Sequence, residues 1–371
     1  MNRKKRMMLI LISLLLLLLI FNPKTITYLQ EQFLGDEREV IDLMELELPH
    51  SSQMVYHKLD DQLLQYWDGI LYSYSMDGSQ NWSTNLSINN PTVETSKNSV
   101  YIIDKSKKQI IRINKQGETI YRTTLNDDIG FIEGKKDDVT LVYHTPDNSR
   151  FRKLSILNGE GKKIGDIVIN DGEVVSTAIS KDEERIILHT VGIGGGKLQT
   201  KLISYNLQGE LLELKGIEDQ LIVNMFFDYK GNLITAHENK LVSIDKSQEI
   251  NWEQPTDKLI KVMDLSGEYI VTYGGEGKNS ILQGRSREKI QVIDMEGNVI
   301  GESKPRESIM GMDYDNEFFI AYSDRSIYLY DKKCNMMMEH QLSVDIEKVF
   351  LLPQKHIAVI SKEKLVFMKI Q

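Results

Sequence analysis

Two glycine-rich segments place a lysine beside several glycines, a combination that binds phosphate in nucleotide-binding loops. They are residues 192–197 (Gly-Ile-Gly-Gly-Gly-Lys) and 274–278 (Gly-Gly-Glu-Gly-Lys). A loop of the GxxxxGK[ST] type also opens a helix and needs a hydroxyl residue after the lysine, because that hydroxyl reaches Mg²⁺. Leu198 and Asn279 follow the two lysines here, and both segments lie between expected strands. We therefore expect no phosphate binding.

The ionisable residues show no spacing typical of a metal centre or of an activated nucleophile. Cys334 is the single cysteine, so an intramolecular disulfide and multi-cysteine zinc sites are excluded. His144 and His189 occupy similar strand ends in successive repeats and could face one another, although a structural role is the simpler interpretation. The sequence predicts no catalytic residue, no metal site and no cofactor. The dispersed histidines are His50, His57, His144, His189, His237, His340 and His356.

A repeated pattern covers the sequence from residue 45 onward. Alternating apolar residues are followed by Asn or Asp, two further residues, usually a glycine, and another strand, as in residues 110–117, 202–209 and 290–297. Alternation with period two predicts strands, and the Asx-x-x-Gly step is turn chemistry in which glycine accepts a positive φ. The turn glycines are expected to be structural: Gly78, Gly117, Gly161, Gly209 and Gly297.

The spacing of this pattern predicts an all-β propeller of four-stranded blades. The Asx-equivalent positions are 75, 114, 158, 206, 245, 294, 331 and 369, which are 37 to 49 residues apart. Units near 40 residues are typical of propeller blades. The last repeat lacks its outer strand, and residues 42–48 could supply it and close the ring. Eight blades are favoured, and seven stay open if the repeat around residue 245, which lacks glycine, is absorbed elsewhere.

The repeats resemble those of the PQQ-like (quinoprotein dehydrogenase-like) propellers. Two of them carry that family's Gly-x-x-x-Trp pattern in residues 78–82 and, with Gln in place of Gly, in 248–252. Together with the apolar leader, the layout is similar to the membrane-anchored PQQ-like propellers of Firmicutes known as the DUF5711 family. We expect Trp82 and Trp252 to pack between blades and not to stack on a ligand.

Quinoprotein chemistry is the enzyme alternative that this resemblance raises. It implies PQQ between a tryptophan and, in many members, a vicinal disulfide, together with a Ca²⁺ site. The sequence has no cysteine pair and no evident ligand set. A non-catalytic binding, scaffold or sensor propeller is therefore favoured, and a degenerate quinoprotein- or lactonase-type enzyme or cofactor binder stays open as the alternative.

Three long repeats predict enlarged hairpins between the second and third strands of their blades. These hairpins cover about 145–152, 192–200 and 274–288 and should emerge on one face. Loops on a rigid scaffold often carry function, so we expect an interaction surface there. Its candidate residues are basic: Arg150, Arg152, Lys197, Lys201, Lys278, Arg285 and Arg287.

The N-terminus predicts a membrane anchor. Four basic residues at 3–6 precede an apolar run, which is typical of a cleaved signal peptide or of an uncleaved anchor. No small-x-small cleavage site follows the run, so the anchor is favoured and cleavage stays open as the alternative. We interpret residues 1–6 as a cytoplasmic segment, 7–23 as a transmembrane signal anchor, 24–44 as a tether that includes the closing strand region, and 45–371 as the propeller. The basic cluster keeps the N-terminus in the cytoplasm and places the propeller outside.

The charge balance restricts the partners. Outside residues 3–6 the protein has 41 basic and 54 acidic residues, a net charge of −13. An acidic body is poorly suited to nucleic acid, because binding to the phosphate backbone depends on Lys and Arg. We expect a monomeric propeller that meets an envelope protein or glycan, with the membrane contacted by the N-terminal helix.

Overall fold

The structure is a computed structural model of the protein. It describes residues 39–371 except 50–53, 137–138, 145–151, 171, 181, 183, 195, 219–220 and 276–287. The expected anchor at 7–23 and most of the tether lie outside the described residues. Within the described residues, no helix is long and apolar enough to cross a membrane.

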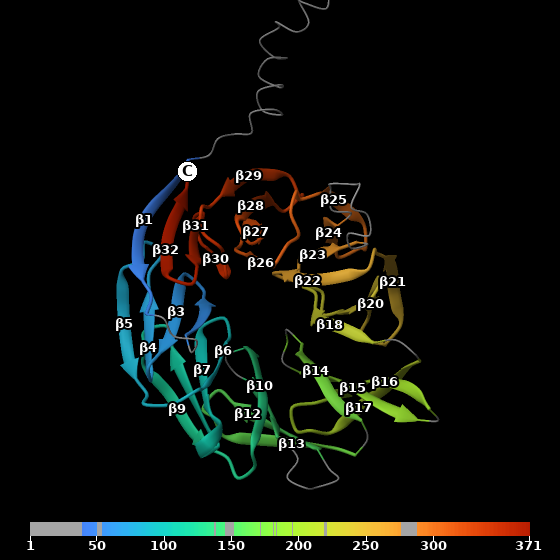
Figure 1. Cartoon of the computed structure of the whole chain (residues 1–371). Coiled ribbons are helices and arrows are strands. Elements are labelled where there is room, and N and C mark those ends of the chain that lie inside the picture. The colour runs from blue at the N-terminus through green and yellow to red at the C-terminus, as the bar shows by residue number, and fades with distance from the viewer. Residues whose placement is uncertain are drawn as a thin grey trace, which may run out of the picture.

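The described strands form eight four-stranded antiparallel sheets, which are the blades of a ring (Figure 1). Blade 1 comprises β2 (Val55–Leu59), β3 (Gln62–Trp67), β4 (Ile70–Tyr74) and β5 (Gln80–Asn85). Blade 2 comprises β6 (Thr92–Thr95), β7 (Ser99–Asp104), β8 (Gln109–Asn114) and β9 (Thr119–Thr124), with a 3-10 turn at Lys105–Lys107. Blade 3 comprises β10 (Ile129–Lys136), β11 (Val139–His144), β12 (Arg152–Asn158) and β13 (Lys163–Ile169). Blade 4 comprises β14 (Glu173–Ile179), β15 (Ile186–Gly194), β16 (Lys197–Tyr205) and β17 (Leu211–Glu218).

The second half of the ring repeats this order. Blade 5 comprises β18 (Ile222–Phe227), β19 (Leu233–His237), β20 (Lys240–Ile244) and β21 (Ile250–Pro255). Blade 6 comprises β22 (Leu259–Leu265), β23 (Tyr269–Gly274), β24 (Lys289–Asp294) and β25 (Val299–Ser303). Blade 7 comprises β26 (Gly311–Tyr314), β27 (Phe318–Tyr322), β28 (Ser326–Asp331) and β29 (Met336–Gln341). Blade 8 comprises β30 (Lys348–Leu352), β31 (His356–Ile360), β32 (Lys364–Ile370) and β1 (Val40–Glu47).

Blade 8 closes the ring with strands from both ends of the propeller. β1 pairs antiparallel with β32, from Val40 opposite Ile370 to Glu47 opposite Lys364. Figure 1 shows the blue N-terminal strand beside the red C-terminal one. The prediction that an N-terminal segment supplies the missing outer strand is therefore confirmed, and the strand begins two residues before the expected 42–48. Closure covers an edge of β32 that would otherwise expose unpaired backbone groups.

Buried apolar side chains form one cluster between each pair of adjacent blades of the described ring. Leu59 and Val100 belong to the cluster between blades 1 and 2, for example, and Leu63 and Phe367 to the one between blades 8 and 1. The core is therefore distributed around the ring, and each blade is held by both neighbours. Opening any one interface would expose apolar surface, whose burial is worth roughly 25 cal/mol per Å².

The turns between third and fourth strands explain the Asx-x-x-Gly pattern. At Asn114 the side-chain Oδ1 accepts from the backbone N–H of Gln116 and Glu118 at 3.0 and 2.9 Å. The fourth residue, Gly117, has φ +83° and donates its N–H to the carbonyl of Asn114. Gly78, Gly161, Gly209 and Gly297 also have positive φ. In blade 5 this position is Gln248, with φ +60°, and the same turn forms without glycine. The eight-blade alternative is confirmed, because the repeat around residue 245 is a complete blade.

Candidate functional site at the channel mouth

The two faces of the ring are distinguished by where the strands begin. Each innermost strand starts on the face that also bears the hairpins between second and third strands, such as the turn between Gly194 and Lys197. We call this the hairpin face. β1 starts at Val40 on the opposite side, where the N–H of Gln371 donates to the carbonyl of Glu39 at 3.1 Å. We call that side the entry face.

The expected enlarged hairpins lie where the repeat lengths placed them, between second and third strands of blades 3, 4 and 6. In blade 4 the extra residues lengthen the strands, because β15 and β16 have nine residues each and pair as far as Gly194 and Lys197. Gly192 therefore lies within a strand, and Gly196 lies in the turn at the hairpin tip. Gly274 ends β23, and the carbonyl of Lys258 leaves no space for a side chain at that position.

The basic candidate residues do not converge on one described site. Arg152 begins β12, and its Nε donates to Oε2 of Glu173 on the next blade at 2.6 Å. Lys197 lies at the exposed tip of the blade 4 hairpin, and Lys201 lies four residues further along β16. Arg150, Lys278, Arg285 and Arg287 lie outside the described residues. Their contribution to a binding surface stays a prediction.

The two tryptophans pack between neighbouring blades. Trp82 on β5 donates its indole N–H to the carbonyl of Lys115 at 2.7 Å, and its ring lies against Gly117, where an added Cβ would come within 2.6 Å. Trp252 on β21 makes the same contacts with Met295 and Gly297. In both cases the aromatic ring on the outermost strand of one blade packs directly against the turn glycine of the next blade.

At several contacts between blades, the outer-strand residue and the facing turn residue complement one another in size. Tyr121 rests against Gly161 in the manner of the tryptophans. Where the outer strand carries Gly301 instead, the facing turn carries Cys334, which adopts φ +65°. Cys334 is buried, and burial together with Asp331 and Glu302 raises the pKa of its thiol to about 12. It fills space between blades as an unreactive thiol.

These contacts do not fit a PQQ site. The two tryptophans lie on outermost strands between blades, with their N–H groups engaged by backbone carbonyls. Among the described residues no group of three or more His, Cys, Asp or Glu side chains is placed to hold a metal ion.

His144 and His189 are buried, and each makes one side-chain hydrogen bond within its own blade. His144 shares a hydrogen bond with Ser155 at 2.9 Å, and His189 shares one with Ser176 at 3.2 Å. Burial, and then the charge of His237 on the following blade, lowers the pKa of His189 to about 4. The neighbour of His189 is therefore His237, and the expectation that His189 faces His144 is not supported.

A set of exposed apolar side chains lies at the start of the innermost strands, on the hairpin face. It consists of Val175, Val223, Ile260 and Met310, from blades 4 to 7, which are 51%, 54%, 50% and 48% exposed. We call these four residues the collar. Large apolar side chains half exposed at equivalent places in four consecutive blades form a patch of the kind that marks interaction sites.

Three of these side chains lie at a β-bulge that recurs near the start of the innermost strands. The pairing of β14 with β15 skips Val175, that of β18 with β19 skips Val223, and that of β22 with β23 skips Ile260. Such bulges re-aim side chains and are frequent beside functional sites. In blade 3 the skipped residue is Gly130, so the collar ends there.

Part of the collar borders a hollow of about 560 Å³ across the inner edges of blades 5 to 7. Val223, Ile260 and Met310 line it together with Lys261 and Tyr322. The hydroxyl of Tyr322 lies where Gly311 would carry a side chain, since an added Cβ would clash with it. Gly311 therefore lets the ring of Tyr322 form one wall of the hollow. The remaining lining residues are Asn224, Leu259, Val262, Met263, Gly311 and Met312.

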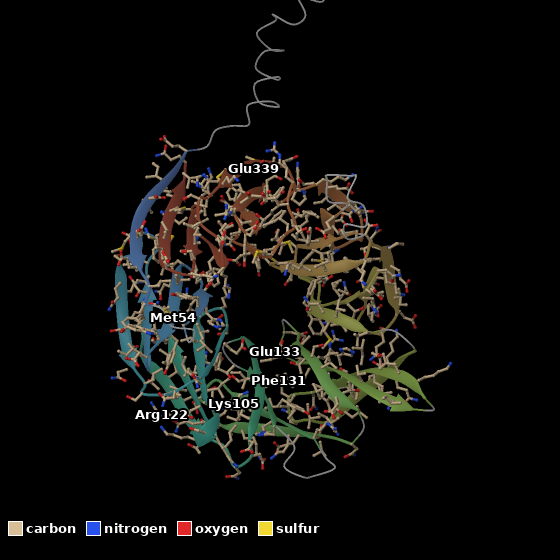
Figure 2. The ribbon with its side chains drawn as sticks, in the orientation of Figure 1. Met54, Lys105, Arg122, Phe131, Glu133 and Glu339 are labelled. Atoms are coloured by element: carbon tan, nitrogen blue, oxygen red, sulfur yellow. The ribbon has the colours of Figure 1, made fainter. Side chains whose placement is uncertain are left out.

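Elsewhere along the inner edge of the ring, polar groups connect neighbouring blades. Glu133 on β10 accepts from the hydroxyl of Thr177 on β14 of the next blade. Phe131, also on β10, stacks on Tyr143 within blade 3, with centroids 4.9 Å apart. Figure 2 shows Phe131 and Glu133 along this strand, beside the central opening. The collar therefore differs from the neighbouring inner edge in being apolar and exposed.

The described residues form a closed, eight-bladed β-propeller. Its exposed collar residues lie at one mouth of the central channel. The protein belongs to the DUF5711 family, described as a family of unknown function, whose sequence profile matches residues 38–370. The match confirms the resemblance at the level of the family and the fold. No curated protein sequence matches this one at a significant level.

Solved propellers share the fold at low sequence identity. The C-terminal WD40 domain of Sif2 superposes with a TM-score of 0.63 at 11% identity, covering 91% of this protein and all of that one. BamB from Moraxella catarrhalis gives 0.53 at 11%, covering 90% of this protein and all of that one. Apo AztD from Citrobacter koseri gives 0.54 at 9%, covering 82% and 94%. These similarities establish the propeller fold alone.

Proposed function

We propose that the protein is a non-catalytic binding platform of the cell envelope, which captures a protein or glycan partner on its hairpin face. The collar is the observation that carries this proposal. Val175, Val223, Ile260 and Met310 expose apolar surface that a propeller does not need for its own packing. Burying such surface against a partner is favourable, and methionine is enriched in protein interfaces, so a protein partner is favoured over a glycan.

The point where the polypeptide enters the ring supports a membrane-tethered arrangement. Val40 lies on the entry face, and the collar lies on the opposite face. If residues 7–23 anchor the protein with the N-terminus in the cytoplasm, the entry face turns toward the membrane. The hairpin face then points away from the lipid and is open to partners in the envelope.

Crosslinking of intact membranes followed by affinity purification tests this function. The double variant Ile260→Ser, Met310→Ser should lose the proteins that wild type captures, because it removes two of the four apolar side chains of the collar without touching a buried cluster. Tyr229→Ser on the entry face is the control, since Tyr229 is 53% exposed and lies outside the collar. Equal capture by wild type and the double variant would overturn the proposal.

A reporter enzyme fused after Gln371 tests the orientation separately. Because Gln371 lies beside Glu39 at the entry face, the fusion leaves the hairpin face unobstructed. We expect activity from a reporter that works outside the cytoplasm. Activity from a cytoplasmic reporter would contradict the proposed extracytoplasmic location of the propeller. The collar would then be expected to bind a cytoplasmic partner.

A further inference from the structure

The hollow beside the collar has one formal charge in an otherwise uncharged lining. Lys261 lies on β22, one residue after the bulge at Ile260, and is half buried. The other lining residues are apolar or neutral, with Met263, Met310 and Met312 prominent among them. An ammonium group surrounded by apolar side chains is costly to desolvate unless an anion accompanies it.

Lys261 has no such anion within the part of the protein that the structure describes. Neighbouring lysines are paired: Lys258 with Glu238 at 3.2 Å, and Lys289 with Asp257 at 3.0 Å. No described carboxylate pairs with Lys261, and its ammonium group makes no hydrogen bond to a described residue. Within the described part of the protein, Lys261 is therefore available to an anion from a partner.

One edge of the strand that carries Lys261 is not paired with another strand of its sheet, because β22 is the terminal strand of that sheet. At the hollow it is joined to β18 by a long hydrogen bond, from Nδ2 of Asn224 to the carbonyl of Val262 at 3.4 Å. An extended peptide can hydrogen-bond to an open sheet edge and place alternate side chains in pockets. This favours a peptide over a lipid anion, which would leave the edge unused.

We propose that the hollow binds an extended segment of a partner protein in which a carboxylate lies within a few residues of an aliphatic side chain. The carboxylate, from Asp, Glu or the C-terminus of the partner, pairs with Lys261. The aliphatic side chain lies between Ile260 and Met310. This inference rests on the proposed function, since it names the chemistry of the partner that the collar captures.

Photo-crosslinking of the full-length protein in its own membrane tests the proposal. A benzophenone amino acid at position 310 is irradiated in cells, and the crosslinked peptides are sequenced by mass spectrometry. The measurement is repeated with Lys261→Met, which keeps the length of the side chain and removes its charge, and with Lys261→Arg, which keeps the charge. Lys304→Met, directly after β25 on the same face and outside the hollow, is the matched control.

We expect the crosslinked segments to carry an acidic residue or a C-terminus close to an aliphatic residue. The yield should fall about tenfold in Lys261→Met, because the partner carboxylate then loses its charged hydrogen-bond donor. Lys261→Arg and Lys304→Met should keep most of the yield. Equal yield from wild type and Lys261→Met, or segments without a carboxylate, would overturn this inference and leave the collar as a binding site. Absence of any crosslink from position 310 would overturn both.

Discussion

Lys58 and Asp313 form an ion pair of 2.7 Å that crosses the closing blade of the propeller. Lys58 lies on β2 of blade 1 and Asp313 on β26 of blade 7, 255 residues further along the sequence. Between them, Leu351 of blade 8 accepts from Lys58 through its carbonyl at 3.2 Å and donates its N–H to Asp313 at 2.8 Å. This ion pair and these hydrogen bonds therefore hold blade 8 between its two neighbours from the channel side.

Removing one partner of this pair should destabilise the ring. Lys58→Met leaves the mostly buried Asp313 carboxylate without its ammonium partner, and such losses cost about 3–5 kcal/mol. The double variant Lys58→Met, Asp313→Asn should recover part of the loss, because no unpaired charge is then left behind. Unfolding midpoints in urea measure both. Additive effects of the two single substitutions would contradict the coupling.

The contact between Trp82 and Gly117 predicts a large effect from a single methyl group. Gly117→Ala places a Cβ within 2.6 Å of the indole and imposes φ +83° on an alanine. We expect a loss of about 2–5 kcal/mol, the sum of overpacking and left-handed backbone strain.

Gly196→Ala is the matched control for that substitution. Gly196 has φ +79°, and no atom lies within 4 Å of an added Cβ. Its cost should be limited to the backbone strain, about 1–2 kcal/mol. Equal losses for the two alanine variants, measured by chemical unfolding, would show that blade-to-blade packing at Gly117 contributes little.

Removal of β1 should open the ring. A protein that begins after Glu47 lacks the partner of β32 and exposes that edge together with apolar residues of blade 8. We expect aggregation or a large fall in melting temperature, because an exposed edge strand pairs with other molecules. A protein that begins at residue 38 keeps β1 and should melt as the full-length protein does. Monomeric, equally stable behaviour of the shorter protein would contradict closure by β1.

Acid should destabilise the propeller below pH 6.5. The pKa of His189 falls from 6.5 to about 4 in the folded state, chiefly through burial, and that of His57 also falls to about 4. Between pH 6.5 and 4 the unfolded state takes up protons that the folded state does not, so stability is lost as the pH falls through this window. For His189 the loss is about 3 kcal/mol at pH 4.

The variant His189→Gln isolates this effect. Its amide can still hydrogen-bond to Ser176 and does not titrate, so its stability should fall less steeply between pH 6.5 and 4 than that of wild type. Melting temperatures at pH 7, 5.5 and 4.5 give the two slopes. Identical slopes would show that His189 is not among the groups responsible.

The sequence predicts the blades well because each one is set by local chemistry. Turns such as the one at Asn114 and Gly117 are specified by four adjacent residues, so their spacing reveals the repeats. The closing role of β1 follows from counting strands in the last repeat. Turns without glycine, at Gln248 and Cys334, are harder to recognise because the neighbouring blade determines what fits there.

The collar and the Lys58–Asp313 pair depend on relationships that the sequence does not display. Val223 and Ile260 meet at one hollow through the register of two different sheets, and Lys58 meets Asp313 through closure of the whole ring. A weak local signal does exist for the collar. Adjacent apolar pairs, Ile222 with Val223 and Leu259 with Ile260, break the alternation of the strands where the bulges occur. The described basic candidates Arg152 and Lys197 lie on the same face as the collar but at other positions.

The comparison of Val223 with Tyr229 tests the central claim most directly. Val223 lies near the start of β18 and Tyr229 lies two residues after its end, so they are on opposite faces, and they are 54% and 53% exposed. A photo-crosslinking residue at each position, in full-length protein in native membranes, samples the two faces with equal accessibility. A binding platform that uses its hairpin face predicts a discrete crosslinked partner from position 223 and none from 229. Equal crosslinking from both positions, or a partner only from 229, would contradict it.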